Sequence, residues 1–191
     1  MTSHGRHWIE ALAFVVVLSA PAGTAYSPTA ERFTAFAVSM TNGATGRSSN
    51  LEVVIDRWST PADRDDLAAA LDERGPEGLL KRLQGRPRIG YVRAASRLGN
   101  DIPFARQVQH ADGSRRIVIV LARQLAFNEV NRGSPTEGYP FTVIELRLDA
   151  AGGGDGRMSV GTKIKVHKGS DQIEHEDYAA GTVFLKDVKV S

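Results

Sequence analysis

Alternating apolar and polar residues cover most of the chain beyond residue 30. In residues 51–58, Leu51, Val53 and Ile55 alternate with Glu52 and Asp56, which is the period of a strand with one covered face. Comparable runs occupy residues 32–40, 89–94, 101–123, 139–149, 157–167, 171–178 and 182–190. Turn-forming residues separate these runs, so the pattern predicts about nine strands in an antiparallel sheet.

One region follows the helical period instead. Thr60 can cap a helix, and Asp63 stands three residues later, as in a weak capping box. Gly75 ends the first helix, Pro76 begins a second short one, and Gly85 stops it. The apolar positions of this helical pair are Leu67, Ala70, Leu71, Leu79, Leu80 and Leu83.

These elements predict a mainly β fold with a single domain over residues 26–191. Because a large antiparallel sheet tends to curl, and a closed sheet has no exposed edges, we expect a closed or nearly closed β-barrel of about 8–9 strands. The helical pair is inserted after the second strand and either plugs one mouth or lies outside. A β-sandwich and a curved α+β sheet are the alternatives.

The sequence Asp112-Gly113 predicts a hairpin with a two-residue turn. That turn sets Arg106 opposite Ile119 and Ile102 opposite Arg123, on the more apolar of the two faces. The prediction therefore places Arg106 and Arg123 inside the barrel.

A second hairpin is predicted across Gly169-Ser170. Its register pairs Lys165 with Glu174 and Lys163 with Glu176, which is a ladder of opposite charges on the solvent side. On the other face His175 lies opposite Ile164, and Asp177 follows on that face. The hairpin therefore predicts a histidine on an apolar face.

Two more charged residues share a face with apolar side chains. Arg57 continues the face of Leu51, Val53 and Ile55, and Glu145 shares a face with Phe141 and Val143. A buried charge must be paired or reach water. We therefore take Arg57, Arg106, Arg123, Glu145 and His175 as candidate ligand-binding residues.

Each candidate also has a purely structural explanation. Arg57 can extend to solvent from a strand end, Arg123 can lie at a rim, and His175 can be a hydrogen-bonded core histidine. A buried ion pair with Glu145 is the alternative for Arg106.

Residues 1–25 are typical of a secretory signal peptide. Arg6 supplies a weak positive charge, residues 11–20 form an apolar core too short to span a bilayer, and Gly23 precedes a small-residue cleavage site. We expect an exported protein, periplasmic or secreted, with no stable membrane span after cleavage. Glu10 is unusual beside such a core and leaves an uncleaved anchor as the alternative.

Composition narrows the functional classes. The chain has 24 Lys and Arg against 22 Asp and Glu, without a clustered basic run, so we expect no nucleic-acid partner. It has no cysteine, which excludes disulfides, thiol catalysis and Cys-ligated metals. No metal-ligand spacing or phosphate-binding loop is evident, and we expect no metal and no cofactor. Trp58 at a strand end is compatible with a homodimer surface.

The predicted strands and export signal resemble the architecture of lipocalin-like and allene-oxide-cyclase-like barrels. The Gly-x-Trp signature of lipocalins is not met, because Trp58 follows Asp56 and Arg57. The resemblance concerns architecture alone, and architecture does not carry function.

The leading functional hypothesis is a non-enzymatic barrel that binds a small amphipathic or anionic ligand in an apolar cavity. The arginines would hold the charged end of that ligand. The second hypothesis is an isomerase, cyclase or hydrolase with His175 or Glu145 as general base and an arginine as oxyanion stabiliser. The third is a structural or partner-binding envelope protein with a filled core.

Overall fold

The computed structural model describes residues 30–39, 47–94, 98–125, 140–161, 163–166, 173–176 and 182–191. The predicted signal peptide lies outside these ranges, as do the turn at Gly169-Ser170, Asp177 and the side chain of His175. Within the described ranges no helix has the length and apolar character needed to cross a bilayer.

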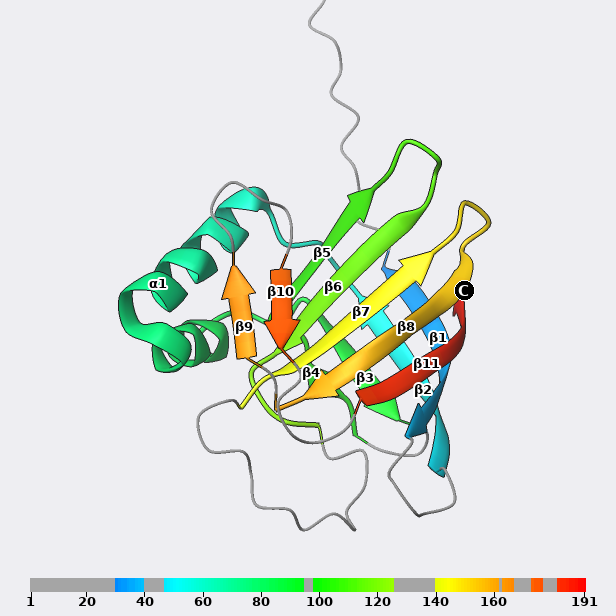
Figure 1. Cartoon of the computed structure of the whole chain (residues 1–191), viewed down its shortest axis with the longest axis horizontal. Coiled ribbons are helices and arrows are strands. Elements are labelled where there is room, and N and C mark those ends of the chain that lie inside the picture. Colours follow the sequence, from blue (N-terminus) through cyan, green and yellow to red (C-terminus); the bar gives the residue numbers. More distant parts are fainter. Residues whose placement is uncertain are drawn as a thin grey trace, which may run out of the picture.

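The described residues form a nine-stranded antiparallel sheet, a two-stranded ribbon and one helix (Figure 1). The sheet order is β4-β3-β2-β1-β11-β8-β7-β6-β5, and the ribbon pairs β9 with β10. The elements are β1 (Glu31–Ser39), β2 (Arg47–Ile55), α1 (Pro61–Gln84), β3 (Gly90–Ala94), β4 (Asn100–Asp101), β5 (Phe104–Gln109), β6 (Arg115–Leu121), β7 (Thr142–Leu148), β8 (Gly153–Val160), β9 (Lys163–Val166), β10 (Ile173–Glu176) and β11 (Thr182–Val190).

The sheet curls until its two edges meet. The edge strands β4 and β5 are consecutive parts of one stretch of chain, joined by Ile102 and Pro103. Ile102 exchanges backbone hydrogen bonds with Ile89 and Gly90 beside β3, while Ser59 N–H donates to the Ala105 carbonyl of β5 at 2.8 Å. The predicted nearly closed β-barrel is therefore confirmed.

The inner face of the barrel is packed with apolar side chains at the described positions. Phe33, Val53, Ile119 and Ile144 belong to one contiguous cluster whose buried members are at most 9% exposed. Side chains this enclosed contact one another, not solvent in a cavity. This packing favours a filled core along the described inner face, and the ligand-filled interior stays a prediction.

Helix α1 lies outside the barrel and covers part of its outer face (Figure 1). Leu67 and Leu79 pack with Phe104, Val120 and Val143 from β5, β6 and β7 in a second apolar cluster. Because only one side of the helix is apolar, the burial of that side fixes it against these strands.

The local signals of the helical pair are confirmed. Thr60 caps the helix and forms a capping box with Asp63, and Gly85 provides the C-cap. The break predicted at Gly75 is a kink with φ 62°, after which Pro76 starts the second arm.

The glycine-rich segment after β7 is mostly strand rather than turn. The turn itself is short, and residues 153–156 already belong to β8. A Cβ at Gly154 would lie 1.9 Å from the Arg147 carbonyl, and one at Gly156 would lie 2.4 Å from the Glu145 carbonyl. These glycines therefore permit close approach of β7 and β8 within the strand.

Candidate functional site

Arg57 lies in the bend after β2 rather than on the inner face of that strand. The strand ends at Ile55, and the backbone N–H groups of Asp56 and Arg57 both donate to the Ile89 carbonyl. The Arg57 side chain is exposed, in agreement with the structural alternative of an arginine that extends to solvent from a strand end. Trp58, the next residue, packs partly buried against the inner core.

Arg106 lies on the outer face of the barrel, which corrects its predicted inward direction. It pairs with Val118 instead of Ile119, and the inner positions of β5 and β6 are held by Ala105 and Ile119. Phe104, two residues before Arg106, packs under α1 in the outer cluster. A one-residue change of register thus moves every β5 side chain to the opposite face.

The register differs because the β5–β6 loop has three residues, not two. His110 N–H donates to the Ser114 carbonyl at 2.9 Å, and Gly113 N–H donates to the His110 carbonyl at 3.0 Å. Gly113 has φ 83°, the left-handed conformation that ends such a loop. Asp112 Oδ1 accepts from Ser114 N–H at 2.9 Å and fixes the same loop from its side chain.

The register predicted for the second hairpin is confirmed. Lys165 pairs with Glu174, Lys163 with Glu176, and Ile164 with His175. Ile164 is buried in the cluster beneath α1. The role predicted for His175 stays a prediction, since its side chain is outside the described part of the chain.

Glu145 is the buried charge of the outer face. Its carboxylate accepts hydrogen bonds from Arg116 Nε at 3.0 Å, Arg147 Nε at 2.9 Å and Arg157 Nη2 at 3.2 Å. Burial raises the pKa of Glu145, but the hydrogen bonds and charges of these three arginines outweigh it and lower the pKa to about 2. The carboxylate is therefore ionised at neutral pH and surrounded by an excess of positive charge.

The three partners of Glu145 were not predicted from the sequence. Arg116 and Arg147 lie directly opposite each other across β6 and β7, and Arg157 lies opposite Glu145 on β8. Like charges placed opposite each other destabilise a sheet unless an opposite charge lies between them. The alternation of Glu145 and Arg147 on one strand is the signal that could have indicated this cluster.

Arg123 is not part of the Glu145 cluster. It lines a surface cleft of about 310 Å³ beside the C-terminal end of α1. The strand β6 ends at Leu121, and the exposed side chain of Arg123 lies beyond it. The cleft is also lined by Arg86, which follows α1, and Arg88, which precedes β3. Arg123 therefore takes the rim position that was the alternative to an interior one, and it lines the same cleft as two other arginines.

Arg86 is the fixed member of this cleft. Its Nη1 donates to Asp63 Oδ1 at 2.6 Å and its Nη2 to Asp66 Oδ2 at 3.2 Å, so two carboxylates of α1 hold its guanidinium. Its Nε is buried, and no acceptor for it is found among the described residues. A buried N–H without an acceptor is costly, and an oxygen atom of a ligand or water would remove that cost.

The other two cations of the cleft are more exposed. Arg88 lies 3.7 Å from the Asp101 carboxylate and 5.1 Å from the centre of the Tyr91 ring. Among the residues that the structure describes, no carboxylate is found paired with Arg123. Leu83, Pro103 and Ala122 add apolar atoms to the lining.

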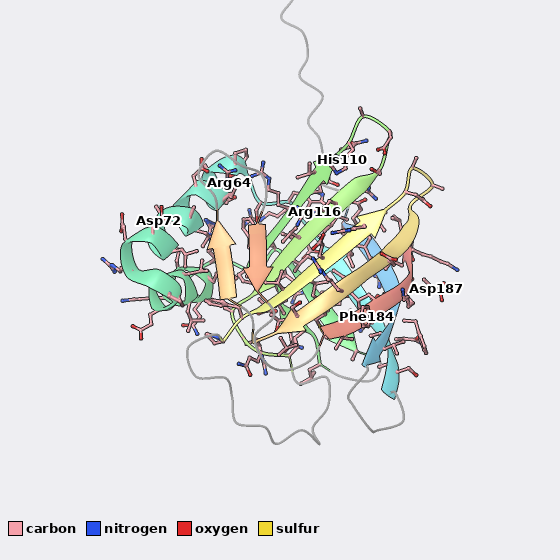
Figure 2. The ribbon with its side chains drawn as sticks, viewed as in Figure 1. Arg64, Asp72, His110, Arg116, Phe184 and Asp187 are labelled. Carbon is pink, nitrogen blue, oxygen red and sulfur yellow. The ribbon has the colours of Figure 1, made fainter. Side chains whose placement is uncertain are left out.

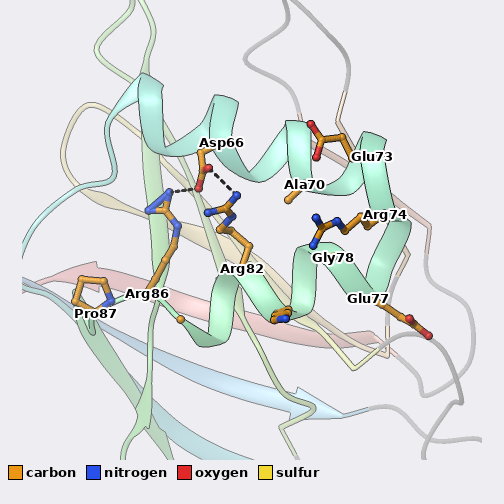
Figure 3. Close-up of a pocket in the computed structure, with 11 residues that line it drawn as sticks. Asp66, Ala70, Glu73, Arg74, Glu77, Gly78, Arg82, Arg86 and Pro87 are labelled. Atoms are coloured by element: carbon orange, nitrogen blue, oxygen red, sulfur yellow. Dashed lines mark hydrogen bonds and ion pairs between the residues drawn. The ribbon is translucent and has the colours of Figure 1, made fainter.

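A larger groove of about 700 Å³ lies between the two arms of α1 (Figure 3). Asp66 lies at one end, 3.5 Å from Arg82 and 3.2 Å from Arg86, and Glu73 and Arg74 are at the other. Positive and negative side chains alternate along this groove, which gives it no preference for either sign of charge.

No group of three or more metal-ligating side chains is found in the part of the chain that the structure describes. Comparisons with family models, with curated proteins and with solved structures find no match to this chain. Function is therefore inferred from two groups of arginines, one around Glu145 and one in the cleft of Arg86, Arg88 and Arg123.

Proposed function

We propose that this protein is an exported, non-enzymatic binding protein that holds a small anionic ligand in the cleft of Arg86, Arg88 and Arg123. The ligand carries a carboxylate or phosphate, whose oxygens match the planar donor pairs of guanidinium groups. The observation that carries the proposal is the convergence of three arginines from separate segments on one cleft.

Preorganisation favours Arg86 as the primary contact. Its guanidinium is held by Asp63 and Asp66, so little conformational entropy is lost when an anion binds beside it. Arg88 and Arg123 can then close on the anion from the exposed sides.

The size and lining of the cleft favour a ligand with an apolar part. A cleft of about 310 Å³ is at the small end of the range typical of ligand sites. Leu83 and Ala122 can contact a short hydrocarbon or aromatic group while the arginines bind its charged end. This retains the amphipathic or anionic ligand expected from the sequence and moves it from the interior to the surface.

Titration calorimetry with phenyl phosphate, and with phenol as its uncharged counterpart, tests the proposal. We expect phenyl phosphate alone to bind, and Arg88→Gln or Arg123→Gln to weaken it by about 1–2 kcal/mol, roughly 5- to 30-fold. Binding should also weaken as salt is added, because two of the cations are exposed.

Arg93→Gln is the matched control for Arg88→Gln. Both arginines lie over the Tyr91 ring, both pair with a carboxylate, and their side chains are 49% and 50% exposed. Only Arg88 lines the cleft. Equal losses in the two variants, or equal binding of phenol, would show that the cleft is not the site.

A second candidate function is that of a partner-binding protein with a filled core. The packed inner face favours it over a barrel with an interior ligand. A protein that binds none of the anionic probes but elutes with a stable partner after gentle purification would support this alternative.

Of the two residues proposed as general base in the enzymatic alternative, Glu145 is poorly suited to that role. A carboxylate such as Glu145, whose pKa is lowered to about 2, is a poor proton acceptor at neutral pH. His175, the other proposed base, stays a prediction, and binding remains the function that we propose.

Export is proposed from the sequence of residues 1–25. Expression in a bacterial host with its own secretion system, followed by mass measurement of the purified chain, tests it. Loss of the N-terminal segment supports export, and an intact Met1 in the cytoplasm contradicts it.

A further inference from the structure

The outer face of the sheet carries two exposed phenylalanines among cations, beyond the area that α1 covers. We call this surface the Phe36–Phe184 face. Its cross-strand register places Arg157 opposite Phe184, and Phe36 opposite Lys186. One row crosses the strands through Glu145, Arg157, Phe184 and Val38. Beside it, Arg116 pairs with Arg147 and Arg147 with Asp155, and the register of β8 and β11 shifts between that group and the pair of Lys186 and Phe36.

Both aromatic rings are accessible. Phe36 and Phe184 are each 41% exposed, whereas their neighbours Ala37 and Leu185 on the inner face are fully buried. Figure 1 shows α1 at the β5–β6 side of the barrel, away from β11 and β1. Figure 2 shows Phe184 on β11 and Arg116 on β6, at the two sides of this face.

Positive charge exceeds negative charge on this face. The cations are Arg116, Arg147, Arg157, Lys186 and Lys189, and the carboxylates on or beside it are Glu145, Asp155 and Asp187. Glu145 is only 2% exposed and serves as a buried anchor for three of the cations. A partner therefore cannot contact its carboxylate, although its charge still offsets one of the cations.

Glu145 also orients the guanidinium groups. Arg116 and Arg147 use Nε to reach Glu145, which leaves their terminal Nη groups for other acceptors. The side chains of Arg147 and Arg157 are 65% and 44% exposed, so these donors can reach a surface that approaches the face.

We propose that the Phe36–Phe184 face docks on the surface of an anionic phospholipid membrane. Charge complementarity selects the occupant: phosphate groups accept from the arginines and lysines, and the apolar layer just below the headgroups receives the two rings. An aromatic ring and a cation directly across a strand lie about 5 Å apart, close enough to contact one lipid at two depths. The folded barrel thus binds the bilayer from outside, without crossing it.

Sedimentation of the purified full chain with vesicles tests this docking. We expect binding to vesicles that contain phosphatidylglycerol, weak binding to vesicles of phosphatidylcholine alone, and release as salt is raised. Arg157→Gln should weaken binding about 5-fold, and the double variant Phe36→Ser, Phe184→Ser at least about 10-fold. All variants carry the same apolar N-terminal segment, so their differences report on the face alone.

Two controls separate this proposal from the cleft and from loss of surface hydrophobicity. Leu98→Ser removes a 93% exposed apolar side chain outside the face, and Arg88→Gln removes a cleft arginine. Both should keep vesicle binding within about 2-fold, since neither side chain lies on the docking face. Arg157→Gln should in turn leave phenyl phosphate binding unchanged, so failure of one proposal is distinguishable from failure of the other.

Three results would overturn the docking. One is equal binding to neutral and anionic vesicles. Another is unchanged vesicle binding by the Phe36→Ser, Phe184→Ser variant, provided that circular dichroism shows this variant to be folded. The third is a lipid-independent dimer that dissociates in the same variant, which would assign the face to a second copy of this chain.

Discussion

At the scale of one residue, Glu145 shows how a charged side chain can be buried on the outer face of a sheet. Its carboxylate is buried, and the cost of that burial is offset by hydrogen bonds from three guanidinium groups. The sequence identified Glu145 as a charge on an apolar face. It did not identify Arg116 or Arg157 as partners, because cross-strand neighbours depend on pairings that local patterns do not contain.

The same residue predicts a specific acid sensitivity. The folded-state pKa of Glu145 is about 2, below its ordinary value of 4.5, so its contribution is complete above pH 4.5 and is lost as pH falls towards 2. The difference of about 2.5 units corresponds to up to about 3 kcal/mol of unfolding free energy. Urea unfolding followed by circular dichroism at several pH values measures this loss.

Glu145→Gln provides the comparison for that measurement. The variant should be about 3–5 kcal/mol less stable at neutral pH, because three guanidinium groups lose their buried counter-ion. Its stability should then change less between pH 4.5 and pH 2 than that of the parent chain. Glu73→Gln, which removes an exposed carboxylate from α1, should leave stability within about 0.5 kcal/mol. Parallel pH curves for parent and Glu145→Gln would contradict the assignment.

At the scale of elements, prediction succeeded where the signal was local. The helix was predicted from its Thr60 cap to its Gly85 stop because caps, Pro76 and Gly75 act on the residues beside them. The first hairpin was predicted with the wrong loop length, since Asp112-Gly113 suits both two- and three-residue loops. That single ambiguity reversed the direction of Arg106.

Strand β11 offers a direct test of which face is the core. Leu185→Ala should lower the unfolding free energy by about 2–5 kcal/mol, because Leu185 is fully buried on the inner face. Phe184→Ala, one residue earlier, should cost less than about 1 kcal/mol, because that ring is 41% exposed. Thermal or urea unfolding of the two variants gives both values. Similar losses would mean that the outer face is covered in solution.

At the scale of the whole molecule, the fold class was readable from the sequence and the strand order was not. Alternation and turns predicted a barrel, but they do not reveal that the first and last described strands of the sheet, β1 and β11, are paired. That pairing joins residues far apart in the chain, and its cost in loop entropy is recovered only when the sheet closes. The packed inner face is likewise a property of all strands together.

This strand order predicts that the C-terminal residues are essential for the entire fold. Strand β11 is central, since it pairs with β1 on one side and β8 on the other, and it supplies Val183, Leu185 and Val188 to the inner core. A chain ending before Thr182 should therefore lose cooperative unfolding by circular dichroism and become sensitive to protease, because two sheet edges and the core would be opened together.

Removal of Ser191 alone is the control. It eliminates one backbone hydrogen bond, from Ser191 N–H to the Arg32 carbonyl, and should keep the cooperative transition. A folded, cooperative chain without β11 would show that the N-terminal and C-terminal halves of the barrel are stable without the pairing that closes them.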